Sequence, residues 1–213
     1  VEIQSRAWNS QPDGEAYWQY LRWPAETAAF MTSVTDRPVW AVTSYFYAWP
    51  WRRIAAPPVE QFVYLAQAVA HGASPMVNLS GGPPAVHEDR RGFTAIKKLY
   101  TFMEVHAELI DGDRSAAETA LVYDQDTLMF YGNRDAAARY IDEVRGVEEA
   151  LFRAHVPFDI VSSGMLARGL DSRYKCLFIP NAACFPENAA TALQSFVTRG
   201  GGAVCTYETG CHD

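Results

Sequence analysis

The sequence has few cysteines, no long apolar run and no excess of positive charge. Its four cysteines all lie from residue 176 onward and form no C-x-x-C pair, which gives little support to a zinc or thioredoxin-like site. No apolar run reaches the roughly 18 residues that a membrane-spanning helix needs, and no signal-peptide pattern opens the chain. The net charge of −7 argues against nucleic acid or an anionic membrane as a partner. We therefore expect a cytoplasmic, reducing location.

The composition provides for a substantial core. Of 213 residues, 49% are hydrophobic, and all six tryptophans lie before residue 52. The chain starts at Val1, inside the strand-like "VEIQS", and stops at "TYETGCHD", soon after another strand-like run. We expect it to be a piece of a longer protein.

Strand-like and helix-like segments alternate along the whole chain. In the first half, strands are predicted at residues 1–5, 37–46 and 74–79, and helices from Pro24, from Pro58 and over 93–109. After a polar linker at 111–118, strands are predicted at 119–124, 157–161, 174–181 and 202–207, with helices over 140–151 and 187–200 and a short helix or turn at 163–170. Short, continuously apolar strands between helices favour parallel sheets that are covered on both faces.

The turn between residues 70 and 74 bears on where a site would lie. A helix runs directly through His71 and Gly72 into an apolar strand that ends near Asn78 and Ser80. In a βα barrel, the turn that enters a strand lies at the bottom face, and the loop that leaves it lies at the catalytic face. Asn78 and Ser80 are therefore better site candidates than His71.

Several segments together resemble a known arrangement. "AQAVAHGASPMVNLSGGPP", "RRGFTAIKKLYTFMEVH", "TALVYDQDT", "VPFDIVSSGML", "YKCLFIPNAACF" and "FVTRGGGAVCTYETG" follow one another along the chain. This order resembles the last βα units of a glycoside-hydrolase barrel followed by the trimerisation domain of family 42 β-galactosidases, including relatives of the "hypothetical glycosyl hydrolase 6" type. The resemblance is strongest over residues 66–210.

The resemblance implies a fold, an activity and an assembly. Residues 1–112 would be the C-terminal units of a (β/α)8 barrel, and residues 113–213 a flavodoxin-like parallel-sheet domain related to class I glutamine amidotransferases. The parent protein would hydrolyse O-glycosidic bonds, with β-galactosides as the named substrates. The resemblance implies that it would form a homo-oligomer, namely a trimer. No metal and no cofactor are expected.

Glu2 is the candidate catalytic carboxylate. Retaining glycosidases need two carboxylates about 5 to 5.5 Å apart, placed at the catalytic ends of barrel strands. Glu2 in "VEIQ" could be a catalytic carboxylate at the end of the sixth barrel strand. The alternative is that it is an ordinary surface glutamate near the end of the chain. Family 42 places its nucleophile after the seventh strand, and "PVWAVTSYFYAWPW" contains no carboxylate there. The acid/base is expected upstream of Val1, and the isolated chain is expected to be inactive.

Aromatic and polar residues near the strand ends are candidates for sugar binding. Tyr45, Trp49, Trp51 and Arg52 could line a sugar subsite, because aromatic faces stack on sugar rings and arginine orients hydroxyls. The alternative is that they pack between domains. Asn78 could hydrogen-bond a substrate hydroxyl or could be a turn residue. The charged loop at 87–91 fits a solvated loop better than a site.

Two further function classes stay open beside the hydrolase. One is a non-catalytic carbohydrate-binding or assembly module. The other is a cysteine-dependent amidotransferase-like enzyme that would use Cys184 as nucleophile and His212 as base. "NAACFPE" lacks the G-x-C-x-G pattern of a nucleophile elbow, and "GGGAV" lacks the spacing of a dinucleotide-binding loop.

Overall fold

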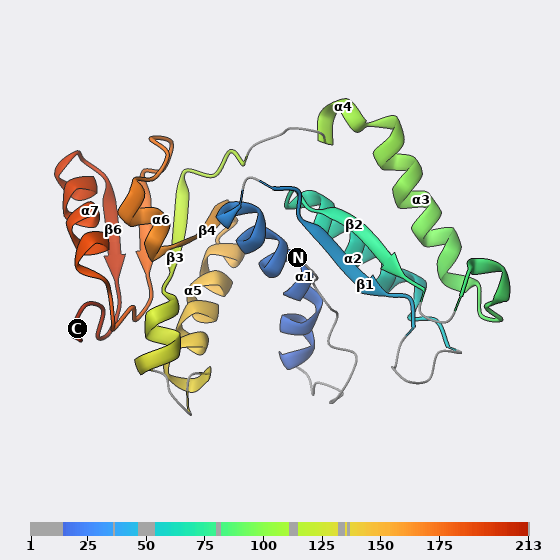
Figure 1. Cartoon of the computed structure of the whole chain (residues 1–213), viewed down its shortest axis with the longest axis horizontal. Coiled ribbons are helices and arrows are strands. Elements are labelled where there is room, and N and C mark those ends of the chain that lie inside the picture. Colours follow the sequence, from blue (N-terminus) through green and yellow to red (C-terminus); the bar gives the residue numbers. More distant parts are fainter. Residues whose placement is uncertain are drawn as a thin grey trace. The chain divides into compact units, whose positions relative to one another are not determined.

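The chain forms two compact units, Val1–Arg114 and Ser115–Asp213 (Figure 1). The computed structural model describes residues 15–35, 37–46, 54–79, 82–110, 115–131, 135 and 137–212. The strand predicted at residues 1–5 lies outside them. So does the predicted domain boundary at 112–113, which stays a prediction.

The first unit consists of two parallel strands and the helices packed on them. Its elements are α1 (Glu15–Val34), β1 (Trp40–Ser44), α2 (Pro58–Ala70), β2 (Ser74–Asn78), the 3-10 turn η1 (Pro84–Val86), α3 (Arg91–Val105) and α4 (Ala107–Ile110). β1 and β2 pair in parallel over their whole length. Each strand is followed by a helix, as predicted from the alternation of the two patterns.

One face of the β1–β2 sheet carries the core of this unit. Ala41 on β1 packs with Ala28 of α1 and Ala68 of α2, and all three are almost fully buried. Directly after β1, Tyr45 packs with Phe93 of α3. Small alanine side chains let the helices approach the strands closely, so this face is the one that the helices cover.

α1 begins earlier than the sequence suggests. The prediction that Pro24 opens this helix was wrong, because α1 begins at Glu15 and contains Pro24 in its interior. Proline suits a first turn best; inside a helix it removes one hydrogen bond and its ring crowds the carbonyl four residues earlier, at a cost of about 3 kcal/mol. The preceding segment "EAYWQYLR" is rich in residues of good helix propensity, which explains why the helix extends to the N-terminal side of the proline.

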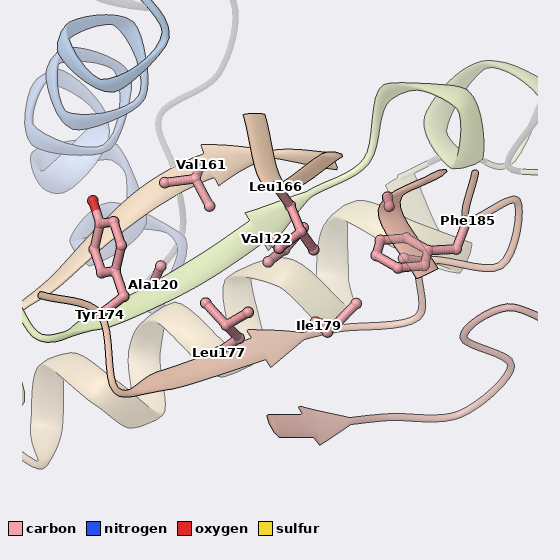
Figure 2. Close-up of a cluster of buried hydrophobic side chains, with 10 residues drawn as sticks. Ala120, Val122, Val161, Leu166, Tyr174, Leu177, Ile179 and Phe185 are labelled. Atoms are coloured by element: carbon pink, nitrogen blue, oxygen red, sulfur yellow. The ribbon is translucent and has the colours of Figure 1, made fainter. Parts of the chain in front are cut away.

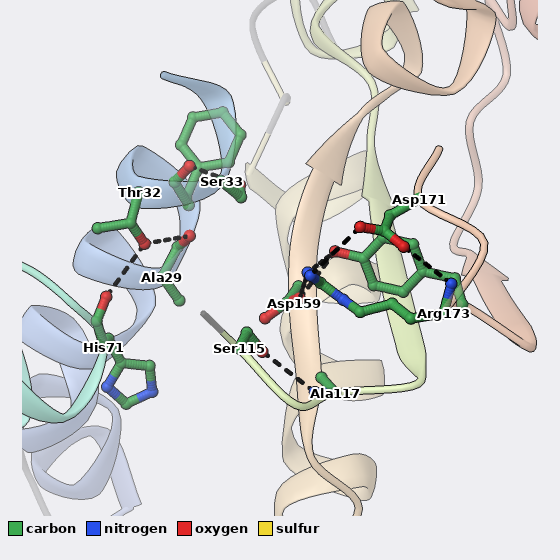
Figure 3. A network of polar contacts seen from close by, with 11 residues as sticks. Ala29, Thr32, Ser33, His71, Ser115, Ala117, Asp159, Asp171 and Arg173 are labelled. Carbon is green, nitrogen blue, oxygen red and sulfur yellow. Dashed lines mark hydrogen bonds and ion pairs between the residues drawn. The ribbon is translucent and has the colours of Figure 1, made fainter. Parts of the chain in front are cut away.

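α2 passes into β2 through a tight turn. Gly72 has a φ of 77°, in the left-handed region that favours glycine after a helix. The Ala73 amide donates to the Ala68 carbonyl at 2.9 Å, and the Thr32 hydroxyl lies 3.1 Å from the His71 carbonyl oxygen (Figure 3). His71 therefore lies at the end of a helix and at the amino end of β2, away from the carboxyl ends of the strands.

The helix predicted over residues 93–109 is two helices. α3 ends at Val105, and His106 lies between it and α4 with its ring centroid 4.6 Å from that of Phe102. The apolar spacing continues across the break, which is why the sequence pattern alone does not show it.

The second unit is a four-stranded parallel sheet with helices. Its elements are β3 (Thr119–Tyr123), the π-helical segments η2 (Thr127–Tyr131) and η4 (Ala137–Ile141), α5 (Asp142–Arg153), β4 (Phe158–Ser162), α6 (Ser163–Arg168), β5 (Cys176–Ile179), α7 (Glu187–Thr198) and β6 (Gly202–Cys205). The spatial strand order is β4-β3-β5-β6. Numbered within the unit this is 2-1-3-4, the order of a flavodoxin-like fold, so this prediction is confirmed.

The core of the second unit lies on both faces of its sheet. Ala120, Val122 and Leu177 are fully buried on one face of the sheet (Figure 2). They share a cluster with Leu166 of α6 and Ala189 of α7. Leu121, between Ala120 and Val122 in sequence, is also fully buried, and side-chain alternation along β3 places it on the opposite face. Burial on both faces produces the continuous apolar pattern of the strand "TALVY".

A polar network closes the amino-terminal side of this sheet. One Arg173 guanidinium nitrogen donates to Asp159 and to the Tyr174 hydroxyl at 2.7 Å each, and the Tyr174 hydroxyl donates to Asp159 at 2.7 Å (Figure 3). Burial, together with the bond to Asp159, raises the pKa of Tyr174 to about 12. The tyrosine therefore stays a neutral donor across the physiological range.

Candidate functional site

The uncovered face of the β1–β2 sheet is the first candidate surface. Residues alternate along each strand, so every second side chain points away from the helices. We call this surface the open face, and its members are Trp40, Val42, Ser44, Ser74, Met76 and Asn78. None of these residues is charged.

Polar residues stand at the carboxyl end of the open face. Parallel register pairs Ser44 with Asn78 as the last residues of β1 and β2. The next pair toward the amino end is apolar, Val42 with Met76. The open face thus changes from apolar to hydrogen-bonding where the strands end, which is the end that carries chemistry in βα barrels.

Asn78 occupies the place that the sequence predicted for it. It is the last residue of β2, and its side chain is exposed. Its backbone carbonyl accepts from the Tyr45 amide at 3.1 Å, which extends the ladder past the end of β1. The backbone is therefore fixed at the point from which the amide side chain projects. Whether Asn78 contacts a sugar stays a prediction.

Ser44 is a site candidate that sequence reasoning missed. Its position beside Asn78 depends on the register between two strands that are 34 residues apart, as the pairing Ser44↔Asn78 shows. The sequence does contain one indication of this position. Residues two apart in a strand face the same side, so Ser44 is expected on the same face of the strand as Trp40 and Val42.

Tyr45 lies behind the strands and not on the open face. Its side chain is 0% exposed, its hydroxyl donates to the Asp89 carbonyl at 2.8 Å, and its ring stacks on Phe93 at 4.6 Å. Its backbone carbonyl accepts from the Gln61 side-chain amide at 2.7 Å. Among the described residues, Tyr45 therefore joins β1 to α2 and α3 and offers no surface to a ligand.

Asp89 holds the segment at Ala55, which follows the loop after β1. Its carboxylate accepts from the Ala55 amide at 2.9 Å and from the Arg91 guanidinium at 2.9 and 2.7 Å. The hydrogen bonds from Arg91 hold the pKa of Asp89 well below its usual range. Phe46 and Ala55 also form an antiparallel bridge, so the base of the loop between them is fixed on both sides.

His87, from the predicted charged loop, is a buried part of this anchor. It is 9% exposed, its Nε2 lies 3.0 Å from the Gly82 carbonyl oxygen, and its ring centroid lies 5.1 Å from that of Phe46. With Asp89, it shows that part of the segment at 87–91 holds the fold together, whereas Glu88 is exposed.

Five predicted site residues lie outside the described residues. They are Glu2, Trp49, Trp51, Arg52 and Ser80. Their predicted roles, as the catalytic carboxylate and the sugar subsite, stay predictions.

The switch point of the second sheet is the other candidate surface. In doubly wound sheets, ligands bind outside the carboxyl ends of the strands where the order reverses, here between β3 and β5. The chain places Asp124 after β3 and Asn181 after β5. Asp124 is fully buried, and its carboxylate accepts from the Thr127 amide at 2.7 Å. Asn181 has a φ of 40° and donates through its side chain to the Arg139 carbonyl at 2.7 Å.

Cys184 at this edge is not set up as a nucleophile. Its amide donates to the Thr127 hydroxyl at 2.9 Å, which fixes the backbone. Burial raises the pKa of its thiol, and the carboxylates of Asp124 and Asp126 raise it further. A reactive cysteine needs the opposite environment, one that stabilises the thiolate.

His212 pairs with a glutamate and a tyrosine. Tyr131 donates to Glu208 at 2.7 Å, and the His212 Nε2 lies 3.5 Å from the same carboxylate oxygen. The hydrogen bond from Tyr131 lowers the pKa of Glu208. This cluster ties the segment after β6 to η2, and it gives His212 a structural partner.

The described part of the chain contains no group of three or more histidine, cysteine, aspartate or glutamate side chains that could hold a metal ion. None of its helices is long and apolar enough to cross a membrane.

Known structures share this fold. A catalytic mutant of a GH42 β-galactosidase from G. stearothermophilus is 18% identical with a TM-score of 0.75, over 98% of this chain and 32% of that chain. The β-galactosidase from Bacillus circulans sp. alkalophilus is 23% identical with a TM-score of 0.66, over 95% and 32% of the two chains. α-L-Fucosidase isoenzyme 2 from Paenibacillus thiaminolyticus is 22% identical with a TM-score of 0.60, over 88% and 27%. At these identities the likeness establishes the fold, and the chain spans about a third of the length of these proteins or less.

A family model matches part of the chain. No curated protein matches the chain. Residues 117–213, however, match the family model described as the β-galactosidase trimerisation domain. The expected resemblance is therefore confirmed: residues 117–213 match the β-galactosidase trimerisation domain model, and the chain as a whole has the fold found in the corresponding part of GH42 β-galactosidases.

Proposed function

We propose that this chain is part of a glycoside hydrolase that cleaves O-glycosidic bonds, with β-galactosides as the expected substrates. The observation that carries the proposal is the open face of β1 and β2, which is polar at its carboxyl end. In a (β/α)8 barrel that face lines the interior, and its carboxyl end opens at the catalytic face. The trimerisation-type second unit supports the same assignment.

The reaction needs two carboxylates and a means of holding the sugar. We assign Glu2 as one carboxylate, acting as the nucleophile at the end of the strand that is predicted at residues 1–5. Trp49, Trp51 and Arg52 would contact the sugar from the loop after β1, and Asn78 would hydrogen-bond a hydroxyl. The burial of Tyr45 supports a role behind the site, where it holds the base of that loop.

The test is hydrolysis of aryl glycosides by the intact protein, by which we mean the longer parent protein that we expect to contain this chain. We expect turnover of 4-nitrophenyl β-D-galactoside, with the β-D-glucoside and the α-L-fucoside assayed beside it to define the sugar. Glu2→Gln should lower kcat about 100-fold or more, because a carboxylate in the chemical step is lost. Glu104→Gln, an exposed position on α3, is the matched control and should leave kcat unchanged.

Two outcomes would count against the proposal in different ways. Full activity of Glu2→Gln would remove Glu2 from the mechanism but leave the hydrolase. The absence of turnover of any glycoside would overturn the hydrolase itself.

A non-catalytic carbohydrate-binding module is the second candidate. The observation in its favour is that the open face, as far as the structure describes it, contains no carboxylate. Binding of galactose to the intact protein without turnover of any glycoside would support this candidate over the hydrolase.

A further inference from the structure

Ser44 and Asn78 are direct neighbours at the end of the open face. They are paired in the parallel register, and each is the last residue of its strand. Neighbouring strands lie about 4.8 Å apart, so the two side chains start from positions that one sugar ring can span. Their alignment comes from backbone pairing on both strands and therefore needs no ligand to form.

Hydrogen bonds to Phe46 already orient the Ser44 hydroxyl. It donates to the Phe46 carbonyl at 3.1 Å and accepts from the Phe46 amide at 3.2 Å. A serine hydroxyl has one proton and two lone pairs, so one lone pair remains for a further donor. Ser44 is thus a fixed acceptor at the edge of the open face.

The chemistry of the pair defines what it can recognise. A hydroxyl and a carboxamide are both neutral, and the open face carries no charged residue. Such a pair suits a neutral hydroxyl group, which can donate to Ser44 while it exchanges a hydrogen bond with the Asn78 amide. A carboxylate or phosphate on the sugar would find no cation among the residues of this face.

We propose that Ser44 and Asn78 together bind one hydroxyl of a neutral sugar, and that Ser44 is a specificity-determining residue of the site. This inference rests on the proposed glycosidase function and adds a residue and a substrate class to it. Pairing in register explains why the two residues act as a unit: a shift of either strand would separate them.

The experiment measures kcat/KM of the intact protein on 4-nitrophenyl β-D-galactoside and its monodeoxy analogues. Asn78→Ala and Ser44→Ala should each lower kcat/KM about 10- to 100-fold, the effect of losing a buried hydrogen bond to substrate. Ser44→Thr keeps the hydroxyl and should restore most of the activity. Because both residues hold the same hydroxyl, the double variant should lose less than the product of the two single losses.

The deoxy analogues separate substrate contact from a structural effect. Removal of the contacted hydroxyl from the substrate should reduce kcat/KM for the wild type. In Asn78→Ala or Ser44→Ala, the same removal should reduce kcat/KM only slightly further, because the contact is already lost. Ser74→Ala is the matched control, because Ser74 lies on the same face of β2 at the opposite end, paired with Trp40. It should match wild-type activity, and thermal unfolding midpoints should be similar for all variants.

Failure of the inference and failure of the proposed function give different results. Two results would overturn the inference and leave the hydrolase standing, provided that the wild type hydrolyses the galactoside. In the first, the two alanine variants match the wild type in kcat/KM. In the second, they lose as much kcat/KM as the wild type when the substrate hydroxyl is removed. If the wild type only binds galactose, and Asn78→Ala and Ser44→Ala weaken that binding, the pair stands and the hydrolase is wrong. If the wild type neither hydrolyses nor binds any of the glycosides, the fucoside included, both are wrong.

Discussion

Single residues in this chain owe their properties to position more than to type. Asn78 ends one parallel strand and Asn181 follows another, yet Asn78 is exposed on an open sheet face, whereas Asn181 is 1% exposed and holds backbone groups. Tyr45 and Cys184 look like site residues in the sequence, whereas their surroundings favour packing and a neutral thiol. Assigning chemistry to a residue therefore requires its neighbours.

Cys184 provides a test at this scale. Its pKa is raised by burial and by Asp124 and Asp126, so at pH 7 the reactive thiolate fraction is lower than for a free thiol. Iodoacetamide labelling of the folded chain, followed by peptide mass spectrometry, should accelerate with pH and reach its midpoint above the value for the same cysteine in urea. Asp126→Asn should move that midpoint down. Selective labelling of Cys184 at pH 7 would instead favour the amidotransferase-like enzyme.

At the scale of elements, backbone spacing between helices and strands determines which substitutions the fold accepts. A Cβ added at Gly92, in α3, would lie 2.8 Å from the ring of the buried Tyr45. A Cβ added at Gly146, in α5, would meet nothing within 4 Å. The same chemical change therefore has opposite consequences in two helices.

The paired substitutions measure this difference. Gly92→Ala should lower the free energy of unfolding by about 1–3 kcal/mol, because overpacking against the ring exceeds the gain in helix propensity. Gly146→Ala should raise it by about 0.5–1 kcal/mol, because propensity acts alone at an exposed site. Urea denaturation of the intact protein gives both values. A stabilising Gly92→Ala would mean that α3 does not pack on Tyr45 as described.

The elements also show what a sequence can and cannot predict here. The strands at 40–44 and 74–78 follow from apolar, β-branched runs, and the alternation with helices correctly predicts parallel sheets. The interior position of Pro24 escapes prediction, because proline is favoured at a helix start and disfavoured inside a helix. The pairing of Ser44 with Asn78 depends on register between distant segments, which a periodic pattern does not contain.

At the scale of the whole molecule, the second unit suggests self-association. Its segment 117–213 matches the β-galactosidase trimerisation domain, and its sheet order is flavodoxin-like. We expect the intact protein to sediment as a homotrimer, with three times its chain mass, in analytical ultracentrifugation over a wide concentration range. A monomer at every concentration would show that this unit has a different role here.

The central claim is that the open face of β1 and β2 lines a sugar-binding barrel. The most direct test is a crystal structure of the intact protein with galactose bound. The account predicts a sugar ring at the carboxyl ends of β1 and β2, with a hydroxyl within hydrogen-bond distance of Ser44 and Asn78. A helix packed over the open face, or galactose bound only elsewhere on the protein, would contradict it.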